Sequence, residues 1–100
     1  MITHVVLARL KDRSDQNIES ILLLLSSLDG KVPGLRRLEV GKDLVHSERS
    51  YDIALIARFD DLMGLESYQK HPIHVPISGK LRELAASIVI VDYESSQLLA

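Results

Sequence analysis

The stretch Asp52-Ile53-Ala54-Leu55-Ile56-Ala57-Arg58-Phe59 decides the fold class of this chain. Its β-branched and aliphatic residues predict a strand. A strand whose sheet has one wet face should alternate apolar and polar residues, yet the five residues from Ile53 are all apolar. We therefore expect both faces of this strand to be covered.

Working outward from this strand, the chain divides into further segments with strand or helix patterns. β-Branched alternation predicts strands over residues 2–10, 35–45 and 87–94, with a bulge at Gly41. Helical spacing predicts a helix from an N-cap at Ser14 to a C′ glycine at Gly30. A short helix capped by Asp60 or Asp61 is expected to break at His71-Pro72, and another to run over residues 73–86.

The resulting order βαββαβ predicts a ferredoxin-like α+β domain, with one four-stranded antiparallel sheet and helices on one face. One hundred residues correspond to a single domain over 1–100, with 95–100 as a tail that frays or docks on a partner. Residues 87–94, like 52–59, are apolar on both faces. Because the helices cover one face, we expect the other to be covered by a second copy, giving a homodimer.

Composition excludes several classes of function. The net charge is −2 with interspersed signs, so we expect no nucleic-acid partner. The longest aliphatic run, Ile21-Leu22-Leu23-Leu24-Leu25, is far below the ~20 residues of a membrane span. No cysteine is present, so thiolate chemistry is excluded. We expect a soluble, cytoplasmic protein without a membrane partner.

Candidate chemistry concentrates in Tyr68-Gln69-Lys70-His71-Pro72-Ile73-His74-Val75, which holds two of the four histidines. An imidazole titrates near neutral pH and can act as a base, and a phenol can polarise a carbonyl. His71 and His74 at i, i+3 lack a third ligand nearby, so we expect no metal site.

Strand periodicity places polar residues at the ends of apolar walls. The predicted pocket walls, grouped by strand face, are His4, Val6 and Ala8; Ile53, Leu55 and Ala57; and Ile88, Ile90 and Asp92. Apolar walls with a few polar groups are typical of a small-molecule pocket. Asp92 is suited to orienting an imidazole. His71 is assigned to the same pocket.

The chain resembles the stress-responsive α/β-barrel (Dabb) family over nearly its whole length. The resemblance rests on short segments in order: His4-Val5-Val6, Val32-Pro33-Gly34, Glu39-Val40-Gly41-Lys42-Asp43, Tyr51-Asp52, Phe59-Asp60, Tyr68-x-x-His71-Pro72-x-His74 and Val91-Asp92-Tyr93. It implies two sheets that close into a homodimeric barrel, with a cavity in each subunit between sheet and helices.

The resemblance also implies a chemistry. Olivetolic acid cyclase, a plant member of the family, cyclises a polyketide by aldol condensation without a cofactor, and its acid–base pair corresponds to Tyr68 and His74. His4 and Asp92 correspond to further positions lining that site. We accordingly expect a small apolar or polyketide-like ligand, no cofactor, and Tyr68 and His74 as catalytic residues of a cyclase or lyase.

Two alternatives to this function are kept. One is a non-enzymatic, stress-related structural dimer, in which Tyr68 and His74 make structural hydrogen bonds. In that interpretation His71 is a turn residue, His4 bonds to backbone and Asp92 faces solvent. The other is a cofactor-free monooxygenase, for which the absence of tryptophan and the single phenylalanine provide little aromatic surface.

Overall fold

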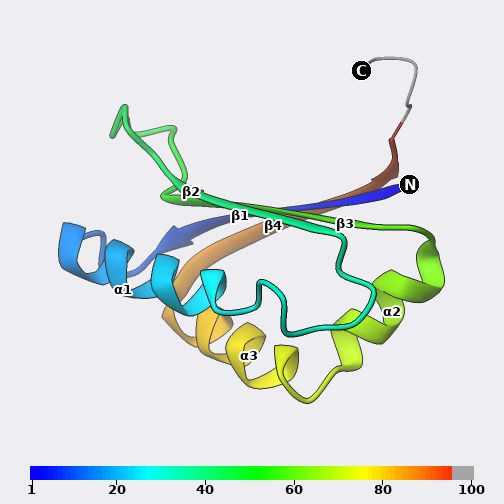
Figure 1. The fold of residues 1–100 in the computed structure, drawn as a ribbon. Helices are drawn as coiled ribbons and strands as arrows, with labels where there is room; N and C mark the ends of the chain where they lie inside the picture. The colour runs from blue at the N-terminus through cyan, green and yellow to red at the C-terminus, as the bar shows by residue number, and fades with distance from the viewer. Residues whose placement is uncertain (96–100) are drawn as a thin grey trace.

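The computed structural model describes residues 1–95 and shows one antiparallel sheet with helices on one side of it (Figure 1). The elements are β1 (Ile2–Leu10), α1 (Asp15–Ser26), β2 (Arg37–Lys42), β3 (Ile53–Phe59), α2 (Leu62–Lys70), α3 (His74–Leu84) and β4 (Ala85–Glu94). The strand order is β2-β3-β1-β4. The predicted ferredoxin-like α+β fold is confirmed. Residues 96–100 of the predicted tail lie outside the described residues.

The helix ends follow from local capping. The Ser14 side chain accepts a hydrogen bond from the Asn17 backbone N–H at 3.3 Å, as predicted for the start of α1. Asp61, one of the two candidates, caps α2 through the Gly64 N–H at 2.9 Å. Helix α2 ends before His71, which has an extended backbone conformation because Pro72 follows it.

The predicted bounds of β2 and the bulge at Gly41 are wrong. Strand β2 ends at Lys42 rather than at residue 45, because the Asp43 carboxylate accepts hydrogen bonds from the Val45 and His46 backbone N–H groups. His46 adopts a positive φ of 57° within this turn. Gly41 pairs in regular register with Ala54. The register shift lies instead between Arg9 and Leu10, where β1 pairs with β4.

Smaller differences concern the ends of three elements. Helix α1 stops at Ser26, and a further turn leads to Gly30, which has φ of 72°. Helix α3 is shorter than the predicted 73–86, and β4 begins two residues before the predicted 87. The backbone carbonyl of Leu84 accepts from the Lys11 N–H at 3.0 Å, so the sheet captures the chain directly after α3.

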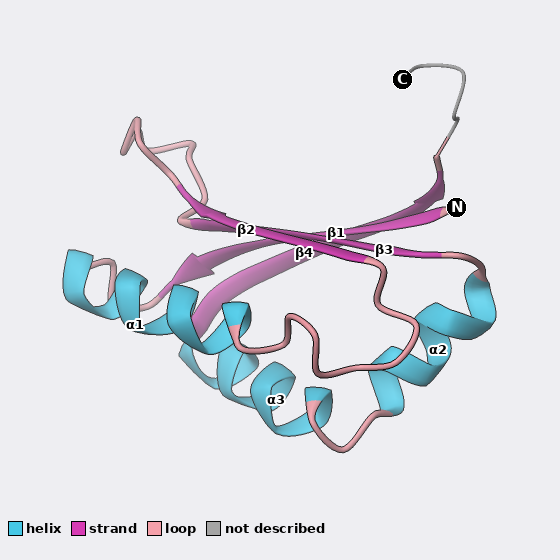
Figure 2. Cartoon of the chain, in the orientation of Figure 1, coloured by secondary structure: helices cyan, strands magenta, loops and turns pink. Residues whose placement is uncertain are grey.

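The hydrophobic core lies between the sheet and the helices, all of which lie below the sheet in Figure 2. Its largest fully buried apolar side chains are Tyr68, Phe59, Leu10, Ile21 and Leu28. At one end of the sheet, the buried carboxylate of Asp52 accepts from the Leu10 backbone N–H at 2.8 Å and from Arg13 Nε at 3.0 Å. This carboxylate ties β3 to the β1–α1 connection.

The opposite face of the sheet carries no helix among the described residues (Figure 2). Register places Val5, Leu7, Val89, Val91 and Tyr93 on this open face. Four of these are substantially exposed: Leu7 at 36%, Val89 at 44%, Val91 at 53% and Tyr93 at 48%. The chain therefore presents the apolar second face that the sequence predicted.

Candidate active site

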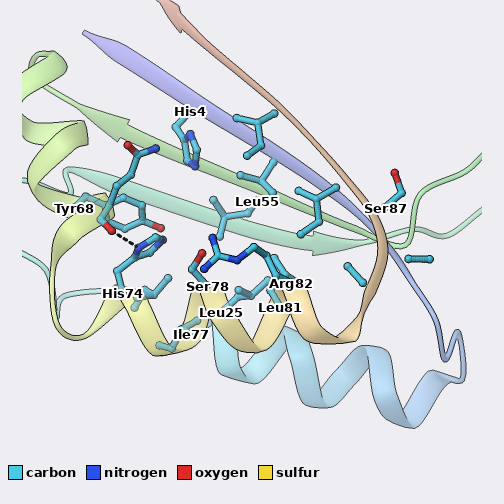
Figure 3. A pocket seen from close by; sticks show the side chains of 17 residues that line it. His4, Leu25, Leu55, Tyr68, His74, Ile77, Ser78, Leu81, Arg82 and Ser87 are labelled. Atoms are coloured by element: carbon cyan, nitrogen blue, oxygen red, sulfur yellow. Dashed lines mark hydrogen bonds between the residues drawn. The ribbon is translucent and has the colours of Figure 1, made fainter.

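A cavity of about 570 Å³ lies between the sheet and α3 and is partly open to solvent (Figure 3). It is lined by His4, Val6, Leu25, Leu28, Leu55, Tyr68, Gln69, His74, Ile77, Ser78, Leu81, Arg82, Ala85, Ala86, Ser87, Ile88 and Ile90. Most of these side chains are apolar; five of the polar ones come from α2 and α3, and the other two, His4 and Ser87, come from β1 and β4. This composition suits a small, largely apolar molecule with one polar end.

Tyr68 is held by α2 at one wall of the cavity. The residue is only 1% exposed, and its ring packs on Phe59 with a centroid separation of 5.0 Å. Burial raises the pKa of Tyr68 to about 12, and no hydrogen bond within the described chain offsets it. Figure 3 shows its hydroxyl pointing toward His74 and the cavity. At neutral pH this group is a neutral hydrogen-bond donor that a ligand can use.

His74 begins α3 and lies next to Tyr68, with ring centroids 4.1 Å apart. Its Nδ1 lies 3.4 Å from the Gln69 backbone carbonyl (dashed line in Figure 3). Because a carbonyl only accepts, Nδ1 carries the proton and Nε2 is left with a free lone pair. Burial is the largest cause of a lowered pKa for His74, and the neighbouring basic residues His4, Arg82 and His71 lower it further. His74 is therefore neutral at pH 7 and able to accept a proton.

His4 approaches the same space from β1, with its ring 6.2 Å from that of Tyr68. The residue is 5% exposed, and its Nδ1 bonds to the carboxylate of Asp92, which pairs with it across β1 and β4. The carboxylate accepts from Nδ1, which orients the ring and leaves Nε2 as the second polar atom of the imidazole. Asp92 thus has the orienting position that the sequence predicted, without lining the cavity itself.

The structure brings together most of the predicted site residues and separates others from it. His4, Val6, Leu55, Tyr68, His74, Ile88 and Ile90 all line the cavity. Ala8, Ile53 and Ala57 share the predicted sheet face but do not line the cavity; at 1%, 3% and 0% exposed, they pack in the core. His71 does not line it either; its Nδ1 accepts from the Ile73 backbone N–H at 3.1 Å, as in its turn interpretation.

Sequence reasoning missed the contribution of α3 beyond His74. Ser78 and Arg82 also line the cavity, and with His74 they are spaced at i, i+4 and i+8. Residues at this spacing share one helix face, so the polar row was present in the sequence as a signal.

The described residues contain no group of three or more histidine, cysteine or acidic side chains placed to hold a metal ion. No helix within these residues is long and apolar enough to cross a bilayer.

A family model for the stress responsive A/B barrel domain, Dabb, matches residues 2–95. The chain belongs to the Dabb family. The family resemblance seen in the sequence is confirmed over nearly the whole chain. Among curated proteins, none matches this chain.

Solved structures of similar proteins share the fold. A dimeric ferredoxin-like protein of unknown function from Thermobifida fusca has 29% identity and a TM-score of 0.83, covering 94% of this chain and 90% of that one. A dimeric protein of unknown function from Bacteroides fragilis has 31% identity and a TM-score of 0.80, and the match covers 94% of this chain and 95% of that one. A hydroxynitrile lyase from Passiflora edulis has a TM-score of 0.82 at 18% identity, and the match covers 96% of this chain and 94% of that one. At this identity the likeness shows the fold alone.

Proposed function

We propose that this Dabb protein binds a small apolar carbonyl compound, or a hydroxyl compound derived from one, in the cavity and performs cofactor-independent acid–base chemistry on it. The observation that carries the proposal is the pairing of Tyr68 with His74. An unpartnered, buried phenol and an imidazole with a free Nε2 meet at one end of an apolar cavity. A purely structural pair would be expected to use these polar atoms within the protein.

The two side chains have complementary roles in this chemistry. Nε2 of His74 takes a proton from a hydroxyl group or from a carbon next to a carbonyl. The electron pair released then forms a new carbonyl with departure of a leaving group, or an enolate that attacks a second carbonyl. The neutral hydroxyl of Tyr68 donates a hydrogen bond to the oxygen that holds negative charge along the way. These steps are those of a lyase and of an aldol cyclase respectively.

The proposal includes a homodimer formed through the open face of the sheet. The apolar residues Leu7, Val89, Val91 and Tyr93 on that face are exposed in a single chain. Contiguous apolar surface of this kind marks an interaction site, and two similar proteins with known structures are described as dimeric. Light scattering at micromolar protein concentration tests this part: a monodisperse monomer would refute it.

The activity is tested with a hydroxynitrile, mandelonitrile, and with a linear polyketide-like diketone. Release of benzaldehyde and formation of cyclised product are followed for wild type, Tyr68→Phe and His74→Gln. We expect each substitution to lower kcat by roughly 100-fold or more, the usual contribution of a positioned acid or base. His46→Gln, in the exposed β2–β3 loop, is the matched control and should retain wild-type kcat. Equal turnover by all variants would refute the roles of Tyr68 and His74.

A further inference from the structure

Helix α3 turns a row of polar side chains toward the cavity. His74, Ser78 and Arg82 follow one another at successive turns and all line the cavity. Arg82 is an exposed residue, and Figure 3 shows its side chain extending from α3 back toward Ser78 and His74. The guanidinium therefore lies at the polar end of the cavity, near the two groups of the proposed acid–base pair.

The charge at this end of the cavity is unbalanced. Arg82 is the single formally charged side chain among the lining residues of the described chain, and no aspartate or glutamate lines the cavity with it. The ion pairs formed within residues 1–95 involve Asp92, Asp52, Asp60 and Glu19, and none includes Arg82. A chain with a net charge of −2 thus leaves one cation facing its cavity without a counter-ion.

The remainder of the cavity is suited to a hydrocarbon chain. The apolar walls come from Leu25 of α1, Leu28 in the turn after α1, Leu55 of β3, and Ile88 and Ile90 of β4. Ile90 is 57% exposed and marks where the cavity reaches the solvent beside β4. A molecule lying here would have one apolar end and one end near Arg82.

We propose that the natural ligand is an apolar carboxylic acid bearing a carbonyl or hydroxyl group, whose carboxylate is bound by Arg82 with the hydroxyl of Ser78 as a second donor. This inference rests on the proposed function and names its substrate class. A planar guanidinium presents paired N–H donors that match the two oxygens of a carboxylate. Binding at this end directs the neighbouring carbonyl or hydroxyl group toward Tyr68 and His74.

Binding of such an anion also affects the base. The positive charge of Arg82 is one of the causes that lower the pKa of His74. A carboxylate paired with Arg82 offsets that charge, so the imidazole becomes a stronger base once the substrate is bound. A neutral ligand of the same shape would not offset the charge of Arg82, so the pKa of His74 would stay lowered by it.

Isothermal titration calorimetry with octanoate and octanamide tests the proposal, because these probes have the same chain and differ in charge. Wild type is compared with Arg82→Gln, Arg82→Lys and the control Arg49→Gln, an exposed arginine in the β2–β3 loop that does not line the cavity. We expect wild type to bind octanoate roughly tenfold more tightly than octanamide, since Arg82 is exposed and its charge is partly screened. Arg82→Gln should remove this preference, Arg82→Lys should keep part of it, and Arg49→Gln should keep all of it.

The possible outcomes separate the two proposals. Equal affinity for octanoate and octanamide, unchanged by Arg82→Gln, would overturn the carboxylate inference while leaving the proposed cavity function intact. A preference for octanoate lost equally in Arg49→Gln would also overturn it, because the effect would then be one of net charge. Failure of both probes to bind at millimolar concentration would overturn this inference and the proposed ligand class together.

Discussion

Replacement of Tyr68 by phenylalanine separates a functional hydroxyl from a structural one. The substitution removes one oxygen atom and keeps the ring that packs on Phe59 and His74. The hydroxyl has no hydrogen-bond partner within the described chain, although the residue is 1% exposed. We therefore expect Tyr68→Phe to fold as stably as wild type, or more stably, while it loses activity.

The expected change in the free energy of unfolding depends on whether the Tyr68 hydroxyl gains a hydrogen bond when the chain folds. A structural hydrogen bond contributes about 1 kcal/mol to the free energy of unfolding, and its loss would lower the Tm of a chain of this size by roughly 4–8 °C. A hydroxyl moved from water to a cavity wall without a partner instead costs up to about 1–3 kcal/mol. Removing it should change the free energy of unfolding by between 0 and about +1 kcal/mol, because water in the open cavity offsets much of the cost.

Urea unfolding followed by circular dichroism, without ligand and at one fixed protein concentration, measures this change. The matched control is Tyr51→Phe. The Tyr51 hydroxyl lies 3.0 Å from Ser87 Oγ, so its removal breaks a hydrogen bond and should lower the free energy of unfolding by about 1 kcal/mol.

A loss of about 1 kcal/mol or more in Tyr68→Phe, equal to that in Tyr51→Phe, would refute the reasoning. It would show that the hydroxyl is satisfied within the folded protein. The non-enzymatic alternative, in which Tyr68 makes a structural hydrogen bond, would then be favoured.

Four further predictions rest on other contacts. Because the folded pKa of Tyr68 is about 12 and the unfolded value about 10, the free energy of unfolding should fall by about 2–3 kcal/mol between pH 10 and pH 12, and Tyr68→Phe should lack this decrease. The pKa of His74 lies below 6.5, so kcat/KM should be constant around neutral pH and should decrease as the pH falls below 6.5. A pH–rate profile with its midpoint above pH 6.5 would contradict the neutral, buried state of His74. The buried carboxylate of Asp52 accepts from a buried backbone N–H and from an arginine, so Asp52→Ala should cost about 3 kcal/mol in urea unfolding, and a cost under 1 kcal/mol would contradict it. Val91→Lys on the open face should disrupt the proposed dimer and yield monomers in light scattering, whereas Leu23→Lys, on the solvent side of α1, should leave the proposed dimer intact.

The sequence determined the elements and their faces because these depend on local periodicity and capping. Alternation with period 2 placed His4, Val6 and Leu55 on the face that the structure shows toward the helices. Ser14 fixed the start of α1, and Pro72 fixed the end of α2. The apolar second face of the strands was readable for the same reason.

The bounds of β2 were predicted less well. Its end depends on hydrogen bonds of the Asp43 side chain to the backbone of the following turn. Such bonds compete with the backbone hydrogen bonds between strands, and the alternating pattern of residues 35–45 does not show where the strand pairing ends.

The tertiary structure decided which residues of each face reach the cavity. Ala57 and Ile90 share one sheet face, yet Ala57 is 0% exposed in the core and Ile90 is 57% exposed at the cavity mouth. Period 2 gives the side of the sheet but not where the helices cross it, since that depends on packing between segments distant in sequence. The free Nε2 of His74 and the inward course of Arg82 have the same origin: each depends on where α3 begins and how it lies against the sheet.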